Sequence, residues 1–242
     1  MMGSDMNEVL FFEVSLRRRR WLAHCSVLVA SAAASMAMPS WAAVGGPVRR
    51  ILVVGDSLSA EYGITRGSGW VALLEQRLAR EKSGATVVNA SISGDTTSGG
   101  LTRLPSLLRQ HKPDLVIIEL GGNDALRGLP LDMTRANLTE MARLSAAAGA
   151  KVVIVGMQLP PNYGRDYGER FASLFADVAR SEKAALVPFL LKGVADGPRA
   201  EAMFQPDRIH PLATAHPRML DNVWPGLEPL LRRKSAAPGG PS

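Results

Sequence analysis

Apolar and polar residues follow two alternating periods along this chain, and the periods predict strands followed by helices. Short apolar runs bounded by turn residues predict strands at 50–55, 85–90, 114–120, 151–156 and 185–190. Apolar residues at helical spacing predict helices at 69–82, 101–110, 131–148, 167–183 and 214–233. Strands that alternate with helices imply a parallel sheet covered on both faces. The pattern therefore predicts an α/β protein, a flavodoxin-like three-layer α/β/α sandwich with a five-stranded parallel sheet.

The first 42 residues differ from the rest of the chain. Four consecutive arginines at 17–20 precede an uncharged, Ala-rich run that ends in small residues around Ala42. A basic block, a short apolar stretch and a small-x-small site are typical of a secretory signal peptide. We expect cleavage after Ala42; a membrane anchor and a twin-arginine signal are the alternatives. The predicted organisation is a signal peptide at 1–42, one folded domain at 43–233 and an unstructured tail at 234–242.

Composition and charge change once the predicted leader is set aside. The only cysteine, Cys25, lies in the leader, so the exported chain has neither a disulfide nor a Cys-based zinc site. The full chain carries 28 basic and 22 acidic residues; without residues 1–42 it carries 24 and 19, a net charge of +5. These charges are scattered and accompany no nucleic-acid recognition motif, which argues against a nucleic-acid partner. A weak contact with anionic lipid surfaces stays open.

Polar motifs follow the predicted strands. In open α/β sheets, ligands bind beyond the carboxyl ends of the strands. The candidate motifs, in chain order, are Gly55-Asp56-Ser57-Leu58, Ser93-Gly94-Asp95-Thr96, Gly121-Gly122-Asn123-Asp124 and Asp207-x-x-His210. Each alone is also a good turn sequence, but all four in this order indicate an active site.

The residue types fit nucleophilic catalysis. A serine such as Ser57 needs a base within hydrogen-bond reach. Three histidines are assigned elsewhere: His24 lies in the leader, and we predict a solvated loop for His111 and a surface position for His216. His210 remains, and Asp207, three residues earlier, can hold its imidazole and support the imidazolium. Gly94 can present a backbone N–H, and Asn123 a side-chain amide, to an oxyanion.

These four motifs resemble the four blocks of the SGNH (GDSL) hydrolases, in particular the secreted bacterial subgroup of acyl-CoA thioesterases, lysophospholipases and arylesterases. The resemblance covers most of residues 50–232. It implies that Ser57 is the nucleophile, His210 the base and Asp207 its orienting acid. It also implies an oxyanion hole made of the Ser57 N–H, the Gly94 N–H and the Asn123 side chain, and no metal or organic cofactor.

The function implied is that of a secreted or periplasmic serine esterase that hydrolyses aryl esters, acyl-CoA or lysophospholipids through an acyl-enzyme. We expect a monomer with a small-molecule ester or thioester substrate. The resemblance also implies a pocket lip at 125–129 and an opposite wall at 159–163. A carbohydrate O-deacetylase on the same scaffold is the alternative, although only 5% aromatic residues leave little to stack on sugars. A non-catalytic binding protein has no need for all four motifs.

Overall fold

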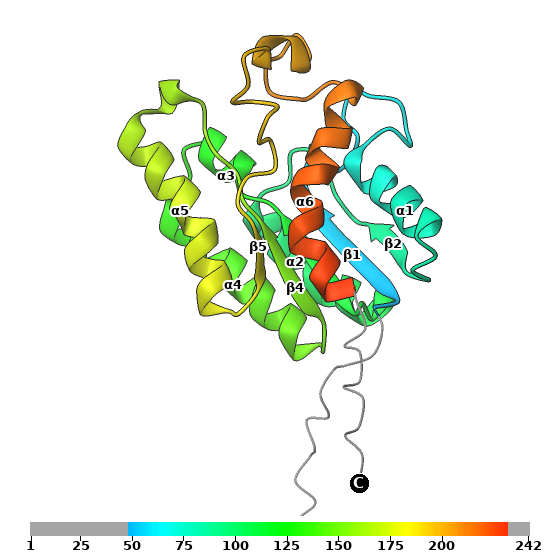
Figure 1. Cartoon of the computed structure of the whole chain (residues 1–242). Coiled ribbons are helices and arrows are strands. Elements are labelled where there is room, and N and C mark those ends of the chain that lie inside the picture. The colour runs from blue at the N-terminus through cyan, green and yellow to red at the C-terminus, as the bar shows by residue number, and fades with distance from the viewer. Residues whose placement is uncertain (1–47, 232–242) are drawn as a thin grey trace, which may run out of the picture. The chain divides into compact units, whose positions relative to one another are not determined.

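A five-stranded parallel sheet forms the centre of the structure, a computed structural model that describes residues 48–231 (Figure 1). The strand order is β2-β1-β3-β4-β5. The strands are β1 (Arg50–Gly55), β2 (Thr86–Asn89), β3 (Leu115–Glu119), β4 (Lys151–Val155) and β5 (Ala185–Val187). All neighbouring pairs are parallel, which confirms the predicted fold class. The predicted leader at 1–42 and tail at 234–242 lie outside the described residues.

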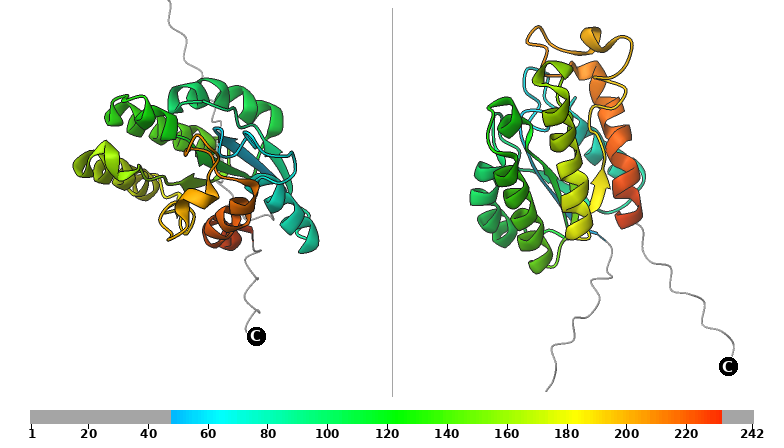
Figure 2. Two further views of the ribbon diagram at one scale, coloured as in Figure 1. Left: turned by 90° about the horizontal axis from the view of Figure 1, so that it is seen from above. Right: turned by 90° about the vertical axis from the view of Figure 1, so that its left-hand side faces the viewer.

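Helices cover both faces of the sheet. They are α1 (Trp70–Arg80), α2 (Thr97–His111), α3 (Gly122–Leu126), α4 (Leu131–Ala147), α5 (Arg165–Ser181) and α6 (His216–Leu231), with short 3₁₀ turns η1 (Pro161–Tyr163), η2 (Ala200–Met203) and η3 (Ala213–Ala215). Helices α1 and α6 pack together on one face, and α2, α4 and α5 lie on the other (Figure 2). Within residues 48–231, every helix is too short or too polar to cross a bilayer.

The main departures from the predicted elements lie where helices begin and end. Helix α2 starts at Thr97, four residues before the predicted 101, because Thr96 caps it by accepting the Gly99 N–H at 3.3 Å. It ends at His111, so the loop position predicted for that residue is wrong. The five-residue helix α3 was not predicted at all, since its sequence reads as a glycine-rich turn.

Strand register brings the ends of β1 and β3 together. All five residues of β3 are buried, as are five of the six in β1. Gly55, the last residue of β1, is aligned with Glu119, the last of β3. A Cβ on Gly55 would lie 2.9 Å from the Glu119 Oε2, so only glycine fits beside this side chain. The motifs that follow both strands therefore start from one edge of the sheet.

His216 is a buried helix cap and not the surface residue that the sequence suggested. It is 2% exposed, and its Nδ1 accepts the backbone N–H of Trp70 at 3.0 Å. Trp70 opens α1, whose own N-cap residue, Gly69, offers no side-chain acceptor. The first N–H groups of a helix need such partners, and here the acceptor comes from α6, 146 residues away.

Burial lowers the pKa of His216 to about 4, an effect that the nearby Glu61 charge partly opposes. The folded pKa therefore lies below the ordinary value of 6.5, and the neutral ring is the form that accepts the Trp70 N–H. The stability that this group contributes is complete above pH 6.5 and is lost as the pH falls toward 4.

We predict that His216→Asn, which keeps an acceptor but cannot take up a proton, loses less of its melting temperature between pH 7 and pH 4.5 than the unsubstituted protein. His216→Ala, which removes the acceptor, should melt about 5 °C lower at pH 7, and this difference should shrink at pH 4.5, where the unsubstituted protein has itself lost most of the contribution of His216. Thermal unfolding followed by circular dichroism measures both effects. An identical pH dependence in His216→Asn and the unsubstituted protein would exclude this role.

Candidate active site

Ser57, His210 and Asp207 form one chain of hydrogen bonds at the carboxyl edge of the sheet. The Ser57 Oγ lies 2.8 Å from the His210 Nε2, and the His210 Nδ1 lies 2.6 Å from the Asp207 Oδ2. Ser57 lies two residues after the end of β1, whereas His210 and Asp207 lie 153 and 150 residues further along the chain. In this arrangement the imidazole can take the serine proton while the carboxylate supports the resulting positive charge.

A tight loop fixes the acid and the base relative to each other. The Asp207 Oδ1 accepts the backbone N–H groups of Ile209 and His210, at 2.9 and 3.0 Å. The hydrogen bonds that Asp207 accepts, first from the His210 backbone N–H and then from the His210 ring, lower the pKa of Asp207 to about 2. An antiparallel bridge between Phe204 and Pro211 closes the loop at its base. The carboxylate is therefore ionised at neutral pH and held in register with the imidazole.

The ring of Tyr62, which lies in the loop between β1 and α1, limits the position of the His210 imidazole. The Tyr62 ring lies 4.3 Å from the His210 ring, centroid to centroid. The Tyr62 carbonyl accepts a hydrogen bond from Gln205, which belongs to the loop that carries Asp207 and His210. The loop after β1, which contains Ser57 and Tyr62, is thus hydrogen-bonded to the loop that contains Asp207 and His210.

The two backbone N–H groups predicted as oxyanion donors are not used in hydrogen bonds within residues 48–231. The N–H groups of Ser57 and Gly94 donate to no acceptor in the part of the chain that the structure describes. Gly94 has φ +78°, a left-handed conformation that favours glycine. Free N–H groups are what an oxyanion hole requires.

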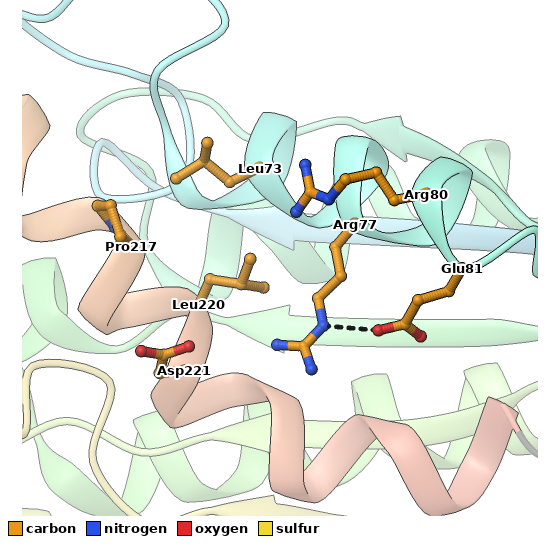
Figure 3. Close-up of a pocket in the computed structure, with 7 residues that line it drawn as sticks. All are labelled: Leu73, Arg77, Arg80, Glu81, Pro217, Leu220 and Asp221. Carbon is orange, nitrogen blue, oxygen red and sulfur yellow. Dashed lines mark hydrogen bonds and ion pairs between the residues drawn. The ribbon is translucent and has the colours of Figure 1, made fainter.

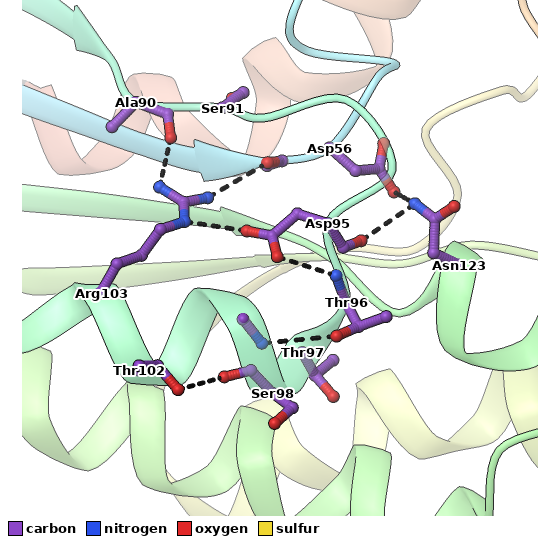
Figure 4. Close-up of polar contacts among 12 residues, drawn as sticks. Asp56, Ala90, Ser91, Asp95, Thr96, Thr97, Ser98, Thr102, Arg103 and Asn123 are labelled. Atoms are coloured by element: carbon purple, nitrogen blue, oxygen red, sulfur yellow. Dashed lines mark hydrogen bonds and ion pairs between the residues drawn. The ribbon is translucent and has the colours of Figure 1, made fainter.

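Asn123 lies in the predicted place, but its amide is already engaged. The Nδ2 donates to the Asp56 Oδ2 at 3.0 Å and to the Asp95 carbonyl at 2.9 Å (Figure 4). These two acceptors use both hydrogens of the amide. An oxyanion bound by Asn123 must therefore share one of these hydrogens with its present acceptor.

Two buried carboxyl groups lie behind Ser57, and sequence reasoning assigned a role to neither. Asp56 and Glu119 are each 2% exposed. Burial raises the pKa of Asp56 to about 6, against the opposing bond from the Leu58 N–H. Burial, together with the Asp56 charge, raises the pKa of Glu119 well above its usual range. Burial thus favours the neutral form of Glu119, and the Ser59 hydroxyl donates to its Oε2 at 2.6 Å. The one feature of the sequence that could have indicated this pair is Glu119 itself, an acidic residue at the end of an otherwise apolar strand.

An apolar cleft of about 560 Å³ opens beside Ser57 and His210. Its volume is within the range of small-molecule sites. Most of its lining side chains are apolar, among them Leu58, Leu126, Met157, Leu159, Phe189, Leu191, Phe204 and Ile209. Of the predicted lip at 125–129, only Leu126 lines the cleft, because Ala125 is buried beneath it. Of the predicted wall at 159–163, Leu159 and Pro160 line it.

A second, smaller hollow of about 380 Å³ lies between α1 and α6 and is lined by none of the residues of the cleft. Leu73, Pro217 and Leu220 form its apolar part. Arg77 points across it and pairs with Glu81 at 3.0 Å (Figure 3). The charges of Arg77 and Glu81 partly neutralise each other, and no residue that lines this hollow is a nucleophile with a base beside it. Among residues 48–231, we find no cluster of three His, Cys, Asp or Glu side chains able to hold a metal ion.

Comparison with characterised proteins gives one consistent family. Residues 53–218 match the model of the GDSL-like Lipase/Acylhydrolase family. The chain is 56% identical over 181 residues to Esterase TesA of Pseudomonas aeruginosa, covering 75% of this chain and 89% of that protein. It is 44% identical to the Arylesterase of Vibrio mimicus over 72% of this chain and 86% of that protein. Thioesterase 1/protease 1/lysophospholipase L1 of Escherichia coli is 40% identical over 76% and 86%.

Solved structures agree with the sequence relatives. The crystal structure of TesA superposes with a TM-score of 0.73 at 55% identity, covering 76% of this chain and all of that one. The esterase EstA from Pseudoalteromonas sp. gives a TM-score of 0.71 at 38% identity, over 76% of this chain and 98% of that one. With the fold, the site motifs and the family match in agreement, the chain belongs to the GDSL-like lipase/acylhydrolase family, the SGNH hydrolases.

Proposed function

We propose that this carboxylic ester hydrolase works through Ser57 as nucleophile, His210 as general base and acid, and Asp207 as the group that orients His210. The observation that supports these roles most directly is the unbroken chain Ser57–His210–Asp207, with bonds of 2.8 and 2.6 Å. Such a chain supplies both the proton acceptor that serine lacks and the negative charge that stabilises it.

The reaction then proceeds in two similar halves. The Ser57 Oγ attacks the acyl carbonyl carbon while its proton passes to the His210 Nε2. The tetrahedral oxyanion accepts hydrogen bonds from the Ser57 and Gly94 N–H groups and shares an N–H of Asn123. When the intermediate collapses, His210 protonates the leaving alcohol or thiol, and an acyl-Ser57 ester remains. Water, deprotonated by His210, attacks this ester and releases the carboxylic acid and Ser57.

The shape of the cleft supports an acyl substrate with a sizeable apolar part. Apolar side chains form the majority of its lining, and Ser57, Asn123 and His210 line the same cleft. Aryl esters, acyl-CoA and lysophospholipids all present such an acyl group, and the names of the relatives span these substrates. A carbohydrate O-deacetylase is less well supported, because apolar side chains form the larger part of the cleft lining.

Exposed apolar side chains support a contact between the cleft mouth and lipid. The six large hydrophobic residues that are most exposed within residues 48–231 all lie in the segments that follow the carboxyl ends of the strands, in loops, in the 3₁₀ turn η1 or at the end of the short helix α3: Tyr62, Ile92, Leu126, Tyr163, Ile209 and Leu212. Aggregated lysophospholipid would meet this rim before entering the cleft. The predicted leader would bring the enzyme to the periplasm or outside the cell, where such lipids are accessible.

We predict that Ser57→Ala lowers kcat/KM for p-nitrophenyl acyl esters by about 10⁴-fold or more, because the nucleophile is lost. The same loss should appear with acyl-CoA and with lysophospholipid, so one panel of substrates tests the nucleophile and ranks the substrate classes. Thermal unfolding provides the control, since a single exposed oxygen atom is removed and the fold should remain. Retained turnover in the folded variant would assign the nucleophile to another residue.

We predict that Asn123→Ala lowers kcat by about 10²-fold and changes KM by only a few-fold, because the amide acts mainly on the transition state. Gln110→Ala, which removes an exposed side-chain amide of α2, is the matched control and should leave both constants unchanged. Steady-state kinetics on a p-nitrophenyl ester separate the two constants. An effect on KM alone would remove Asn123 from the oxyanion hole.

A further inference from the structure

One arginine of α2 ties together three segments that surround the candidate site. The Nε of Arg103 donates to the Asp95 Oδ2 at 2.8 Å, and its terminal nitrogens donate to the carbonyls of Ala90 and Gly55, the latter at 3.4 Å (Figure 4). Gly55 ends β1 two residues before Ser57, and Ala90 directly follows β2. The ion pair is largely shielded, with 19% of the Arg103 side chain and 12% of the Asp95 side chain exposed.

Asp95 passes this restraint on to the amide of Asn123. Its Oδ2 is held by Arg103 and its Oδ1 by the Thr96 N–H at 3.0 Å, while its own N–H donates to the Ile92 carbonyl. The remaining polar group of Asp95, its backbone carbonyl, accepts the Asn123 Nδ2 at 2.9 Å. Since a carbonyl oxygen can accept a hydrogen bond but cannot donate one, this contact keeps the NH₂ end of the amide, and not its oxygen, facing the loop that contains Gly94.

The three contacts of Arg103 use the geometry of a guanidinium. Its N–H donors lie in one plane and point in fixed directions, so a single side chain can bond the Asp95 carboxylate and two carbonyls at once. A lysine would keep the charge but present a single flexible ammonium. A shielded ion pair is weak evidence for added stability, because desolvation offsets the attraction between the charges. We therefore look for the role of Arg103 in how it orients the groups that it bonds, and not in added stability.

We propose that Arg103 is a positioning residue of this site: through Asp95, it holds the Asn123 amide in the orientation that donates to the oxyanion. The inference rests on the proposed function of Asn123 as an oxyanion donor. It extends that function to a residue of α2 that touches no substrate.

Arg103→Lys tests this role, alone and combined with Asn123→Ala. We expect Arg103→Lys to lower kcat about tenfold with KM unchanged within about twofold, since a misplaced donor loses part of its effect. In the Asn123→Ala protein, the same substitution should change kcat by less than about twofold, because no donor remains to be misplaced. Arg109→Lys, at an exposed arginine of the same helix, is the matched control and should leave kcat unchanged.

Gly99→Ala disturbs Asp95 without altering any charge. A Cβ at Gly99 would lie 1.9 Å from the Asp95 Oδ1, so the carboxylate has to move. Alanine is also the better helix former. We therefore expect a lower kcat, an unchanged KM and no loss of melting temperature, a combination that a purely structural role of Arg103 does not produce.

The outcomes separate the two levels of the proposal. If Asn123→Ala lowers kcat but Arg103→Lys gives the same tenfold loss with and without Asn123, Arg103 does not act through this amide and the inference fails. An unchanged kcat in both Arg103→Lys and Gly99→Ala would overturn it as well. If Asn123→Ala itself leaves kcat unchanged, it is the proposed function of Asn123 that fails.

Discussion

The parallel pairing of β1 with β3 is the constraint on which the rest of the site depends. It aligns Gly55 with Glu119, so that the chain leaves both strands at the same edge and at the same height. Ser57 follows one strand and Asn123 the other, each within four residues of the strand end. The base reaches this edge only through the long segment after β5, and its 2.8 Å contact with Ser57 spans 153 residues. The sheet therefore provides the precision, and the loop between β5 and α6 provides the base.

Building a site at this edge has a cost, which the two buried carboxyl groups show. Asp56 and Glu119 both have raised pKa values, because burial disfavours their charged forms. In the folded chain they hold protons to higher pH than in the unfolded chain, so what they contribute to stability is complete below the ordinary carboxyl pKa and is lost as the pH rises through their folded pKa values, about 6 for Asp56. An apolar pair would avoid this loss. Asp56, however, accepts from Asn123 and from the Leu58 N–H, and thus helps to shape the chain on both sides of Ser57.

The sequence was sufficient for the fold, because strand and helix periods are local properties of the chain. It also pointed to Ser57, Asp207 and His210, whose side chains lie within hydrogen-bond distance of one another in the structure, since turn motifs after strands mark the edge where ligands bind. It failed for His216, whose role depends on an acceptor needed by Trp70 in a distant helix. It gave no role to Arg103 or Glu119 for the same reason: each acts on groups from other strands and loops. What local patterns miss here are the polar contacts between distant segments.

The three proposed oxyanion donors differ in what holds them in place. The Ser57 and Gly94 N–H groups belong to the backbone, so the strand end and the turn at Gly94 fix their directions. The Asn123 amide is a side chain that could present its oxygen as easily as its nitrogen, and rotation of that group would replace a donor by an acceptor. Only partners that accept on both hydrogens exclude the reversed orientation, and Asp56 and the Asp95 carbonyl are such partners. The buried Asp56 carboxyl and the shielded Arg103–Asp95 ion pair thus both act on the one proposed donor that the backbone cannot orient.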